Sequence, residues 1–369
     1  MSKNMTRVKG DRVRMGVIGL GVMGQEHCAS FDRIAEAQLA AVCDGYGDNA
    51  RKTGEKHQVP FFTDHRALID SGLCDAVLVA TPHPVRPPIA LDVMNAGLHL
   101  LSEKPLAECV SAADLMVRTA RRKKVAFGVM FQRRASPPVR KALDWIRSGA
   151  LGTVCRATLI APEFRPQAYY NSGAWRGTWK GEGGGVMINQ APHWLDLFIL
   201  FGGMPQAVFG RCATRLHRME TEDVAEALLT YADGGSGYFY ATTNEPGSGN
   251  MLEVSGTKGK LCYRDDILTL QRFSEPVPDF SARTELPFGK PECLKEDPFV
   301  SSETWGHADI IRNFARHLLH GDPLLSPGED GLKSLELANA VWLSAHLKRP
   351  VKLPLSRKAY DRFLAGKRG

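Results

Sequence analysis

The first third of the chain alternates short apolar runs with stretches whose apolar residues recur at helical spacing. The apolar runs, which predict strands, lie at 13–18, 38–43, 75–81, 99–103 and 125–131. Helices are expected between them, at 25–34, up to about 95 after a Pro-rich turn at 82–88, and at 112–124. Such a succession is typical of a doubly wound α/β fold, whose parallel sheet binds ligands beyond the carboxyl ends of its strands.

The pattern changes near Arg134. Beyond a helix at 139–149, further strands are expected at about 154–161, 206–217, 223–231, 236–244, 250–255 and 259–271. A mostly antiparallel sheet after a parallel one marks a second domain. We therefore expect a dinucleotide-binding domain at 1–133 and a second α/β domain at 134–369.

The last part of the second domain is harder to assign. A Pro-rich stretch at 275–299 is expected to be an irregular loop with a functional or interface role. Two amphipathic helices, at 305–320 and 328–347, are expected to close the chain.

A glycine motif stands at the end of the first apolar run. Gly19, Gly21 and Gly24 form G-x-G-x-x-G between a strand and a helix. The first glycine allows a tight turn, the second lets the backbone approach a pyrophosphate, and the third lets helix and strand pack closely. The helix N-terminus then offers N–H groups and a positive dipole end to phosphate. A glycine turn alone is weak evidence, but this strand–turn–helix context predicts dinucleotide binding.

The second apolar run ends in Asp44, 20 residues after Gly24. A carboxylate at this place is expected to accept hydrogen bonds from the adenosine ribose hydroxyls. It would also repel a 2′-phosphate, which favours NAD over NADP, although Arg51 and Lys52 nearby could meet such a phosphate. The alternative is that Asp44 only begins the turn Asp44-Gly45.

The first candidate for chemistry is Glu103-Lys104-Pro105, at the end of the fourth apolar run. Pro105 disfavours a helical backbone at Lys104 and keeps this residue extended. An ammonium at this strand end would lie near a nicotinamide and could stabilise alkoxide character on the reacting oxygen. The alternative is a surface lysine in the turn before the next helix.

The second candidate lies in the stretch 183–196, which we expect to be helical with a disturbance at Pro192. Asn189, His193 and Asp196 would then share one helical face. A histidine oriented by a carboxylate is suited to general-base catalysis near neutral pH. The alternative is a core histidine bonded to the backbone. No metal site is expected, because no cysteine is near and no second histidine stands at ligand spacing.

Aromatic side chains and a guanidinium come just before these glycines. Tyr169, Tyr170, Trp175, Arg176 and Trp179 lie within this short stretch. Such residues can line the pocket of a polyhydroxylated ligand, or they can form a packed loop with one ion pair. The sequence leaves both interpretations open.

These motifs together resemble the glucose–fructose oxidoreductase/inositol dehydrogenase/MocA (Gfo/Idh/MocA) family, from about Val13 to Val351. The matching pieces are the glycine turn, Ala80-Thr-Pro82, Glu103-Lys-Pro105, the stretch 183–196, Gly256-Thr-Lys-Gly259 and Gly306-His to Asn313. The resemblance implies a Rossmann domain followed by an α/β domain with a large, open, mostly antiparallel sheet. It also implies NAD(P)-linked oxidation or reduction of a sugar, polyol or glycoside, with Lys104 and His193 as catalytic residues. The Lys104–Pro105 peptide is often cis in this family.

With the motifs, the resemblance assigns two sets of binding residues. The cofactor set is Gly19, Gly21, Val22, Met23, Gly24, Asp44, Thr81, Pro82, His83, Glu103, Lys104, Gln132, Trp175 and Arg176. The substrate set is Lys104, Tyr169, Arg176, Asn189 and His193. The open sheet implies a homodimer or homotetramer.

The chain departs from the family at Asn189, where many inositol-dehydrogenase-like members carry Asp. An amide has no titratable proton, so the proton would pass to His193 or Lys104. Asn189-Gln190 resembles the subgroup that acts on sugars and glycosides. Two other functions stay open: a glycoside hydrolase that oxidises its substrate transiently with bound NAD, and a non-catalytic dinucleotide-binding regulator.

Composition narrows the function classes. The 369 residues are 43% hydrophobic and 24% charged, with a net charge of +7. The densest basic run, 121–124 with Arg118, falls at a helix end, which explains it better than nucleic-acid binding does. No apolar run approaches the roughly 18 residues of a membrane span. Eight scattered cysteines without a C-x-x-C pair favour reduced thiols, and we expect a cytoplasmic protein.

Overall fold

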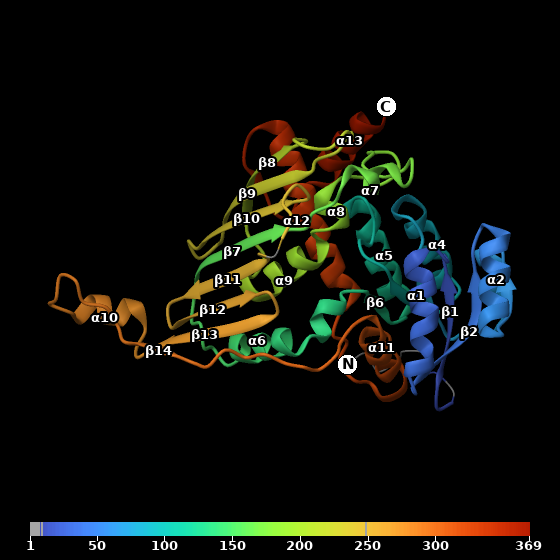
Figure 1. Ribbon diagram of the computed structural model, residues 1–369, viewed down its shortest axis with the longest axis horizontal. Helices are drawn as coiled ribbons and strands as arrows, with labels where there is room; N and C mark the ends of the chain where they lie inside the picture. Colours follow the sequence, from blue (N-terminus) through green and yellow to red (C-terminus); the bar gives the residue numbers. More distant parts are fainter. Residues whose placement is uncertain (1–7, 9, 248) are drawn as a thin grey trace. The chain divides into compact units, whose positions relative to one another are not determined.

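The computed structural model describes residue 8, residues 10–247 and residues 249–369, and its contacts divide the chain into two compact units (Figure 1). Unit 1 contains the chain up to Ala135, Gly181–Gly183 and Trp305–Leu335. Unit 2 contains Ser136–Lys180, Gly184–Thr304 and Glu336–Gly369. This grouping differs from a single division at 133/134, because the segment 305–335 belongs with unit 1.

Unit 1 is built on a six-stranded parallel sheet with the order β3-β2-β1-β4-β5-β6. The strands are β1 (Val13–Ile18), β2 (Ala37–Cys43), β3 (Phe61–Phe62), β4 (Ala76–Val79), β5 (His99–Ser102) and β6 (Phe127–Val129). The five strands expected from apolar runs are confirmed. Only the two-residue β3 was missed, because so short a strand leaves no periodic pattern.

The helices of unit 1 complete a doubly wound fold. They are α1 (Val22–Ser30), α2 (Gly47–His57), α3 (His65–Asp70), α4 (Arg86–Asn95), α5 (Val110–Lys123) and α11 (His307–His320). Three 3₁₀ turns, η1 (Phe31–Arg33), η2 (His83–Val85) and η3 (Gln132–Ala135), join them. Right-handed crossovers place α1 and α2 on one face of the sheet and α4 and α5 on the other.

α11 supplies part of the core of unit 1. Ile310, Ile311 and Phe314 are buried in the same cluster as Val13 and Met15 of β1. Burying a side chain of this size stabilises by about 1.5–3 kcal/mol. The apolar stripe of α11 therefore ties the late segment 305–335 to the parallel sheet.

Unit 2 is built on a nine-stranded sheet with the order β14-β13-β12-β11-β7-β10-β9-β8-β15. The strands are β7 (Val154–Pro162), β8 (Ala207–Ala213), β9 (Val224–Thr230), β10 (Ser236–Thr242), β11 (Met251–Gly256), β12 (Gly259–Arg264), β13 (Ile267–Phe273), β14 (Cys293–Lys295) and β15 (Val351–Lys352). Only β7 and β10 pair in parallel; the other neighbours are antiparallel. The expected mostly antiparallel sheet is confirmed.

One strand prediction was wrong. The single strand expected at 259–271 is a hairpin of β12 and β13, which turns at Asp265 and Asp266. Both aspartates adopt a positive φ, at 49° and 62°. The apolar alternation continues on both sides of this turn, so the pattern alone did not show the break.

Unit 2 also contains helices that the sequence did not predict. Its helices are α6 (Pro137–Arg147), α7 (Gln167–Asn171), α8 (Val186–Asn189), α9 (Pro192–Gly202), α10 (Val277–Arg283), α13 (Arg357–Arg368) and most of α12 (Gly328–Leu347). The stretch 275–299 is thus not wholly irregular, and α13 follows the two helices expected to end the chain. α13 buries Tyr360, Phe363 and Leu364. Basic residues surround these three apolar positions in the sequence, so the apolar pattern is too weak to predict a helix.

The large sheet leaves one face partly bare. α9 packs on β7 and β11, and alternate residues of the strands are buried beneath it. Phe209 and Leu228, direct cross-strand partners on β8 and β9, are 46% and 60% exposed. An apolar cross-strand pair in water is a candidate contact for another surface.

All eight cysteines are free thiols, as the sequence predicted. Burial raises the pKa of Cys28, Cys43 and Cys74 to about 12, so these thiols are inert at neutral pH. Over the described ranges, no helix is long and apolar enough to cross a membrane.

Three consecutive glycines lead into α8. A Cβ on Gly183 would lie 2.7 Å from the Glu108 side chain, and one on Gly184 would lie 2.3 Å from the Trp342 ring. A Cβ on Gly185 would lie 1.9 Å from the carbonyl oxygen of Glu222. Each of the three glycines is therefore required, because a different neighbour occupies the place that its Cβ would take.

Glu222 binds the start of α8. Its buried carboxylate accepts hydrogen bonds from the backbone N–H groups of Gly185 and Met187, each at 3.1 Å. Burial raises the pKa of this carboxyl to about 7, although those hydrogen bonds act in the opposite direction. The stretch that leads to Asn189 and His193 is thus held by a group that titrates near neutrality.

The variant Glu222→Gln tests this linkage. A raised pKa means that the contribution of Glu222 to stability is complete below the unfolded value near 4.5 and is lost as the pH rises through about 7. Between about pH 5 and pH 7.5, the wild type should lose roughly 1–3 kcal/mol more unfolding free energy than the Gln variant does. Urea unfolding at several pH values measures this difference, and equal pH slopes would contradict it.

Candidate functional site

The strand register of unit 1 brings several sequence-predicted residues to one edge. Ile18 stands beside Cys43 and Val79, and Val79 stands beside Ser102. The residues that follow these strand ends therefore emerge next to one another at the carboxyl edge of the sheet. They include the glycine turn, Asp44, Thr81-Pro82-His83 and Glu103-Lys104.

The glycine turn has the geometry that its three glycines require. Gly19 has a φ of +92°, and a Cβ there would lie 2.8 Å from the backbone of Ala80 and Thr81. A Cβ on Gly24 would lie 1.8 Å from the carbonyl oxygen of Gly19. Gly21 differs, because a Cβ there would meet no atom within 4 Å. The fold explains Gly19 and Gly24, whereas Gly21, at the start of α1, faces open space and is not required by packing.

Asp44 is held in place by this turn. Its carboxylate accepts a hydrogen bond from the Leu20 N–H at 2.7 Å and another from the Tyr46 N–H at 2.8 Å. Both oxygens keep lone pairs for further donors. The two basic residues on α2 lie differently: Arg51 pairs with Glu55 at 3.2 Å, whereas Lys52 remains beside a pocket.

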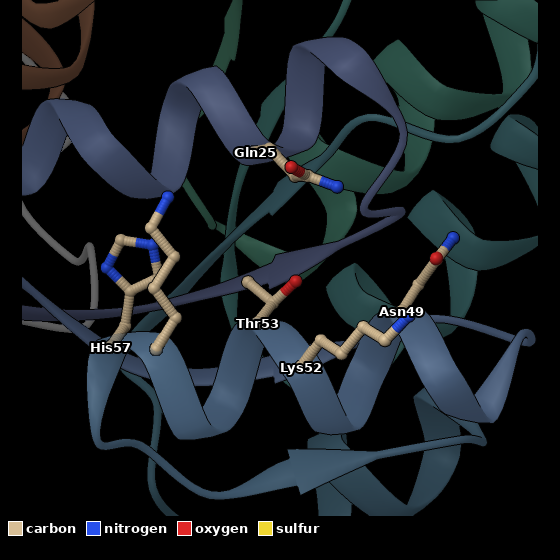
Figure 2. A pocket seen from close by; sticks show the side chains of 6 residues that line it. Gln25, Asn49, Lys52, Thr53 and His57 are labelled. Carbon is tan, nitrogen blue, oxygen red and sulfur yellow. The ribbon is translucent and has the colours of Figure 1, made fainter.

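This pocket lies between α1 and α2 (Figure 2). Gln25 reaches it from α1, and the α2 residues Asn49, Lys52, Thr53, Lys56 and His57 line its other side. The pocket is basic, but both of its lysines are exposed on the surface of α2. None of the lining residues belongs to the predicted cofactor or substrate sets.

The remaining unit 1 residues of the predicted cofactor set are placed as follows. Val22 is exposed and Met23 half-buried in the first turn of α1. Thr81 Oγ1 and Gln132 Oε1 are buried and accept or donate no hydrogen bond within the part of the chain that the structure describes. Buried polar atoms of this kind are normally satisfied by protein, an ordered water or a ligand.

His83 and Arg86 follow Pro82, which is exposed. His83 Nδ1 donates to the carbonyl oxygen of Glu182 at 2.8 Å. Burial lowers the pKa of His83 to about 3, and the positive charge of Arg86 contributes to the same shift. The imidazole is therefore neutral at physiological pH. His83 can therefore offer polar contacts to a ligand but no charge.

The Glu103-Lys104-Pro105 turn is fixed by its own carboxylate. Glu103 Oε2 accepts a hydrogen bond from the Lys104 N–H at 2.9 Å, and Oε1 lies 2.8 Å from His27 Nε2. Burial would raise the pKa of Glu103, but the interactions with His27, Lys104 and Arg86 together bring it well below its usual value. The Lys104–Pro105 peptide is cis, and Lys104 is half-buried.

In unit 2, two of the predicted substrate residues, Arg176 and Asn189, contact the hydroxyl of a third, Tyr169, and Gln190 joins them. The Tyr169 hydroxyl lies 2.6 Å from Arg176 Nη1, 2.9 Å from Asn189 Nδ2 and 3.2 Å from Gln190 Nε2. The Arg176 guanidinium also lies over the rings of Tyr169 and Trp175, at 4.2 and 4.4 Å from their centroids. Tyr169, Tyr170, Trp175 and Arg176 are thus in mutual contact, whereas Trp179 packs against Trp342 and Phe363 instead.

The helix expected over 183–196 is broken in two. α8 ends at Asn189, and α9 begins at Pro192, whose ring lacks the N–H that a continuous helix needs. The prediction that Asn189, His193 and Asp196 share one helical face was therefore wrong. His193 is half-buried in the first turn of α9, and Asp196 is buried one turn further on.

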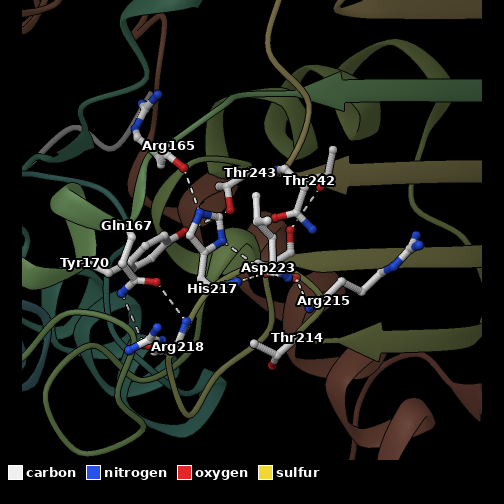
Figure 3. A network of polar contacts seen from close by, with 12 residues as sticks. Arg165, Gln167, Tyr170, Thr214, Arg215, His217, Arg218, Asp223, Thr242 and Thr243 are labelled. Carbon is white, nitrogen blue, oxygen red and sulfur yellow. Dashed lines mark hydrogen bonds and ion pairs between the residues drawn. The ribbon is translucent and has the colours of Figure 1, made fainter.

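Sequence analysis did not predict a polar network around His217 and Asp223 (Figure 3). His217 Nε2 donates to the Arg165 carbonyl at 2.7 Å, and His217 Nδ1 lies 3.1 Å from Asp223 Oδ2. Tyr170 and Thr243 share a hydrogen bond of 2.9 Å between their hydroxyls. Because Arg165 and Tyr170 flank Tyr169, the network fixes the start of α7, which carries Tyr169. The members of the network are scattered over the sequence, so no motif could have found it.

No group of three or more His, Cys, Asp or Glu residues within the described ranges is arranged to hold a metal ion.

Sequence comparison identifies two matching family domains. Residues 13–131 match the oxidoreductase family with an NAD-binding Rossmann fold, and residues 139–262 match the GFO/IDH/MocA C-terminal domain. The boundary between the matches falls where the chain passes from the parallel to the mostly antiparallel sheet.

Individual proteins align over most of their length. The chain is 25% identical over 351 residues to myo-inositol 2-dehydrogenase of Thermotoga maritima, covering 92% of this chain and 98% of the relative. It is 26% identical over 305 residues to levoglucosan dehydrogenase of Pseudarthrobacter phenanthrenivorans, covering 69% and 75%.

A solved structure supports the same relationship. The WlbA dehydrogenase of Bordetella pertussis, crystallised with NADH and UDP-GlcNAcA, superimposes with a TM-score of 0.79 at 26% identity. The alignment covers 94% of this chain and all of that one. With both domains matched in order, the chain belongs to the Gfo/Idh/MocA family of NAD(P)-dependent oxidoreductases.

Proposed function

We propose that this protein is an NAD-dependent dehydrogenase that oxidises a secondary hydroxyl of a sugar, polyol or glycoside. One observation carries the proposal: the open glycine turn, the anchored Asp44 and the Lys104 turn share the carboxyl edge of one parallel sheet. Residues 1–133 would bind the cofactor, and residues 134–369 would bind the substrate and a second subunit.

The residues present fit a dinucleotide. Gly21 leaves space for the diphosphate, and Asp44 would accept the adenosine ribose hydroxyls. Thr81 and Gln132 would bind through polar atoms that are otherwise without hydrogen bonds. Preference for NAD follows from the carboxylate of Asp44, which disfavours a 2′-phosphate.

Two side chains would act on the reacting oxygen, His193 as a proton acceptor and Lys104 as a hydrogen-bond donor. Bound NAD supplies a hydride acceptor for the substrate carbon. His193 would remove the proton of the substrate hydroxyl as that carbon becomes a carbonyl. Lys104 would donate a hydrogen bond to the same oxygen and stabilise its developing negative charge.

Substrate binding would use the Tyr169 cluster. Arg176 is already oriented by Tyr169 and Ser172, so little side-chain entropy is lost when it binds a ligand. Asn189 would donate or accept a hydrogen bond at a neighbouring hydroxyl, but its amide cannot act as a base. Two relatives are named for inositol and levoglucosan, and a third was crystallised with UDP-GlcNAcA; these compounds are polyhydroxylated, which supports this substrate class.

A second copy of the chain would cover the bare face of the large sheet. Phe209 and Leu228 form an exposed apolar pair there. The connection between β13 and β14 exposes more apolar surface: α10 has no buried residue, and Phe288 is 99% exposed. Figure 1 shows α10 standing beyond the ends of β13 and β14. Apolar surfaces of this kind favour self-association over a free monomer.

The variant His193→Ala tests the catalytic assignment. Losing a general base should lower kcat by about 10²–10⁴-fold. The affinity for NAD should stay nearly unchanged, because His193 is not in the predicted cofactor set. NADH formation at 340 nm with a panel of hexoses, inositols, uronates and glycosides gives kcat, and fluorescence titration gives NAD affinity.

His346→Ala is the matched control, since it removes an exposed histidine of α12 and should leave turnover normal. Full activity of His193→Ala would remove His193 from the mechanism. Substrate consumption without net NADH would instead indicate transient oxidation and would contradict the proposed reaction.

The variant Leu228→Asp tests self-association. A carboxylate in the centre of a desolvated interface should shift the protein towards monomer, because an unpaired charge costs several kcal/mol to bury. Light scattering across a range of concentrations measures the mass. Leu115→Asp, at a 42% exposed position on α5, is the control and should not change it. A wild-type monomer, or an unchanged mass in Leu228→Asp, would contradict the interface.

A further inference from the structure

The backbone of the Lys104 turn is held by side chains that no motif assigned. Glu103 binds the Lys104 N–H through one carboxylate oxygen and His27 through the other. Arg86, the first residue of α4, donates to the carbonyl oxygens of Pro105 and Thr81. His27, Arg86 and Glu103 are all at most 5% exposed.

His27 connects this turn to the nucleotide-binding helix. It lies in α1, which begins directly after Gly21, and its side chain is fully buried. A carboxylate only accepts hydrogen bonds, so His27 Nε2 is the donor to Glu103 Oε1. The other ring nitrogen, Nδ1, is buried without a hydrogen-bond partner within the described residues. The His27 imidazole therefore has one polar task, which is to orient Glu103.

His27 is itself packed against a second histidine. The His307 ring, from α11, contacts the His27 ring edge-to-face with centroids 5.2 Å apart. His307 Nδ1 lies 3.2 Å from Glu26 Oε1. This packing fixes the orientation of the His27 ring, and so the direction in which Nε2 points.

We propose that His27, Glu103 and Arg86 form a buried frame that positions Lys104, with His27 as the residue that ties Lys104 to the nucleotide turn. The proposal rests on the catalytic role of Lys104 given above. His27 is a positioning residue, since it would touch neither substrate nor cofactor.

Stability alone does not account for such a frame. A buried carboxylate costs several kcal/mol in desolvation, and well-packed apolar side chains of similar volume are often at least as stabilising. Every hydrogen bond that these three side chains make in the frame ends on the turn or on Thr81 beside it. Because a displacement of about 1 Å in a catalytic group can cost roughly 100-fold in rate, exact placement of the Lys104 backbone has a direct catalytic value.

The test compares His27→Leu with His27→Gln. Leucine fills the space but cannot donate to Glu103, whereas the Nε2 of glutamine can take the place of His27 Nε2. We expect His27→Leu to lower kcat by about 10–100-fold, with the dissociation constant for NAD changed by less than about 3-fold. His27→Gln should recover most of kcat.

His65→Leu is the matched control. His65 also pairs with a carboxylate in unit 1, Asp92 at 2.9 Å, but this pair has no contact with the Lys104 turn. Its loss should leave kcat unchanged. Melting temperatures of all variants show whether each is folded. Equal losses in His65→Leu and His27→Leu, or no rescue by glutamine, would mean a general structural effect and would overturn the proposal.

Lys104→Ala distinguishes the catalytic role of Lys104 from the positioning role of His27. If Lys104→Ala keeps full turnover, the proposed function of Lys104 fails. If Lys104→Ala is inactive and His27→Leu is fully active, the proposed function stands and the frame is refuted. If both lose activity and the double variant is no worse than Lys104→Ala, His27 acts through Lys104.

Discussion

The site of this protein depends on the register of one parallel sheet. Because β1, β2, β4 and β5 end side by side, four chain segments that are far apart in sequence leave the sheet at a common edge. The strands themselves are buried and apolar, so they contribute rigidity but no chemistry. Every polar group that we assign to the cofactor in unit 1 lies in the turns beyond that edge or at η3, and the sheet fixes how far apart these groups are.

Buried carboxylates hold several non-helical segments in place by accepting hydrogen bonds from the backbone N–H groups of those segments. Glu103 binds the N–H of Lys104, Glu222 those of Gly185 and Met187, and Asp223 those of residues 215–217. In each place the acceptor satisfies backbone donors that secondary structure leaves unpaired. These carboxylates therefore fix the Lys104 turn, the glycine stretch that leads into α8 and the segment 215–217, none of which is in regular secondary structure.

The sequence predicted what local patterns encode. The five apolar strands of unit 1, the glycine turn and the cis Lys104–Pro105 peptide expected from the family are all present. The disturbance expected at Pro192 is present as the break between α8 and α9. The Asp265-Asp266 hairpin was not predicted, and the sequence pattern gave no sign that α11 packs into unit 1. The partners of Glu103, His27 and Arg86, could not be found either, because contacts between residues distant in sequence leave no periodicity.

If the glycine turn is kept open for a dinucleotide, Gly21 is the position where a side chain should block binding most directly. Its φ of −66° suits any residue, and a Cβ there would contact nothing in the protein, so the fold does not require glycine. A Gly21→Leu variant should keep the wild-type melting temperature in the absence of ligand, yet bind NAD at least about 100-fold more weakly in calorimetric titration, a loss of about 2.7 kcal/mol. Unchanged NAD affinity in a folded Gly21→Leu protein would show that the cofactor does not bind over this turn.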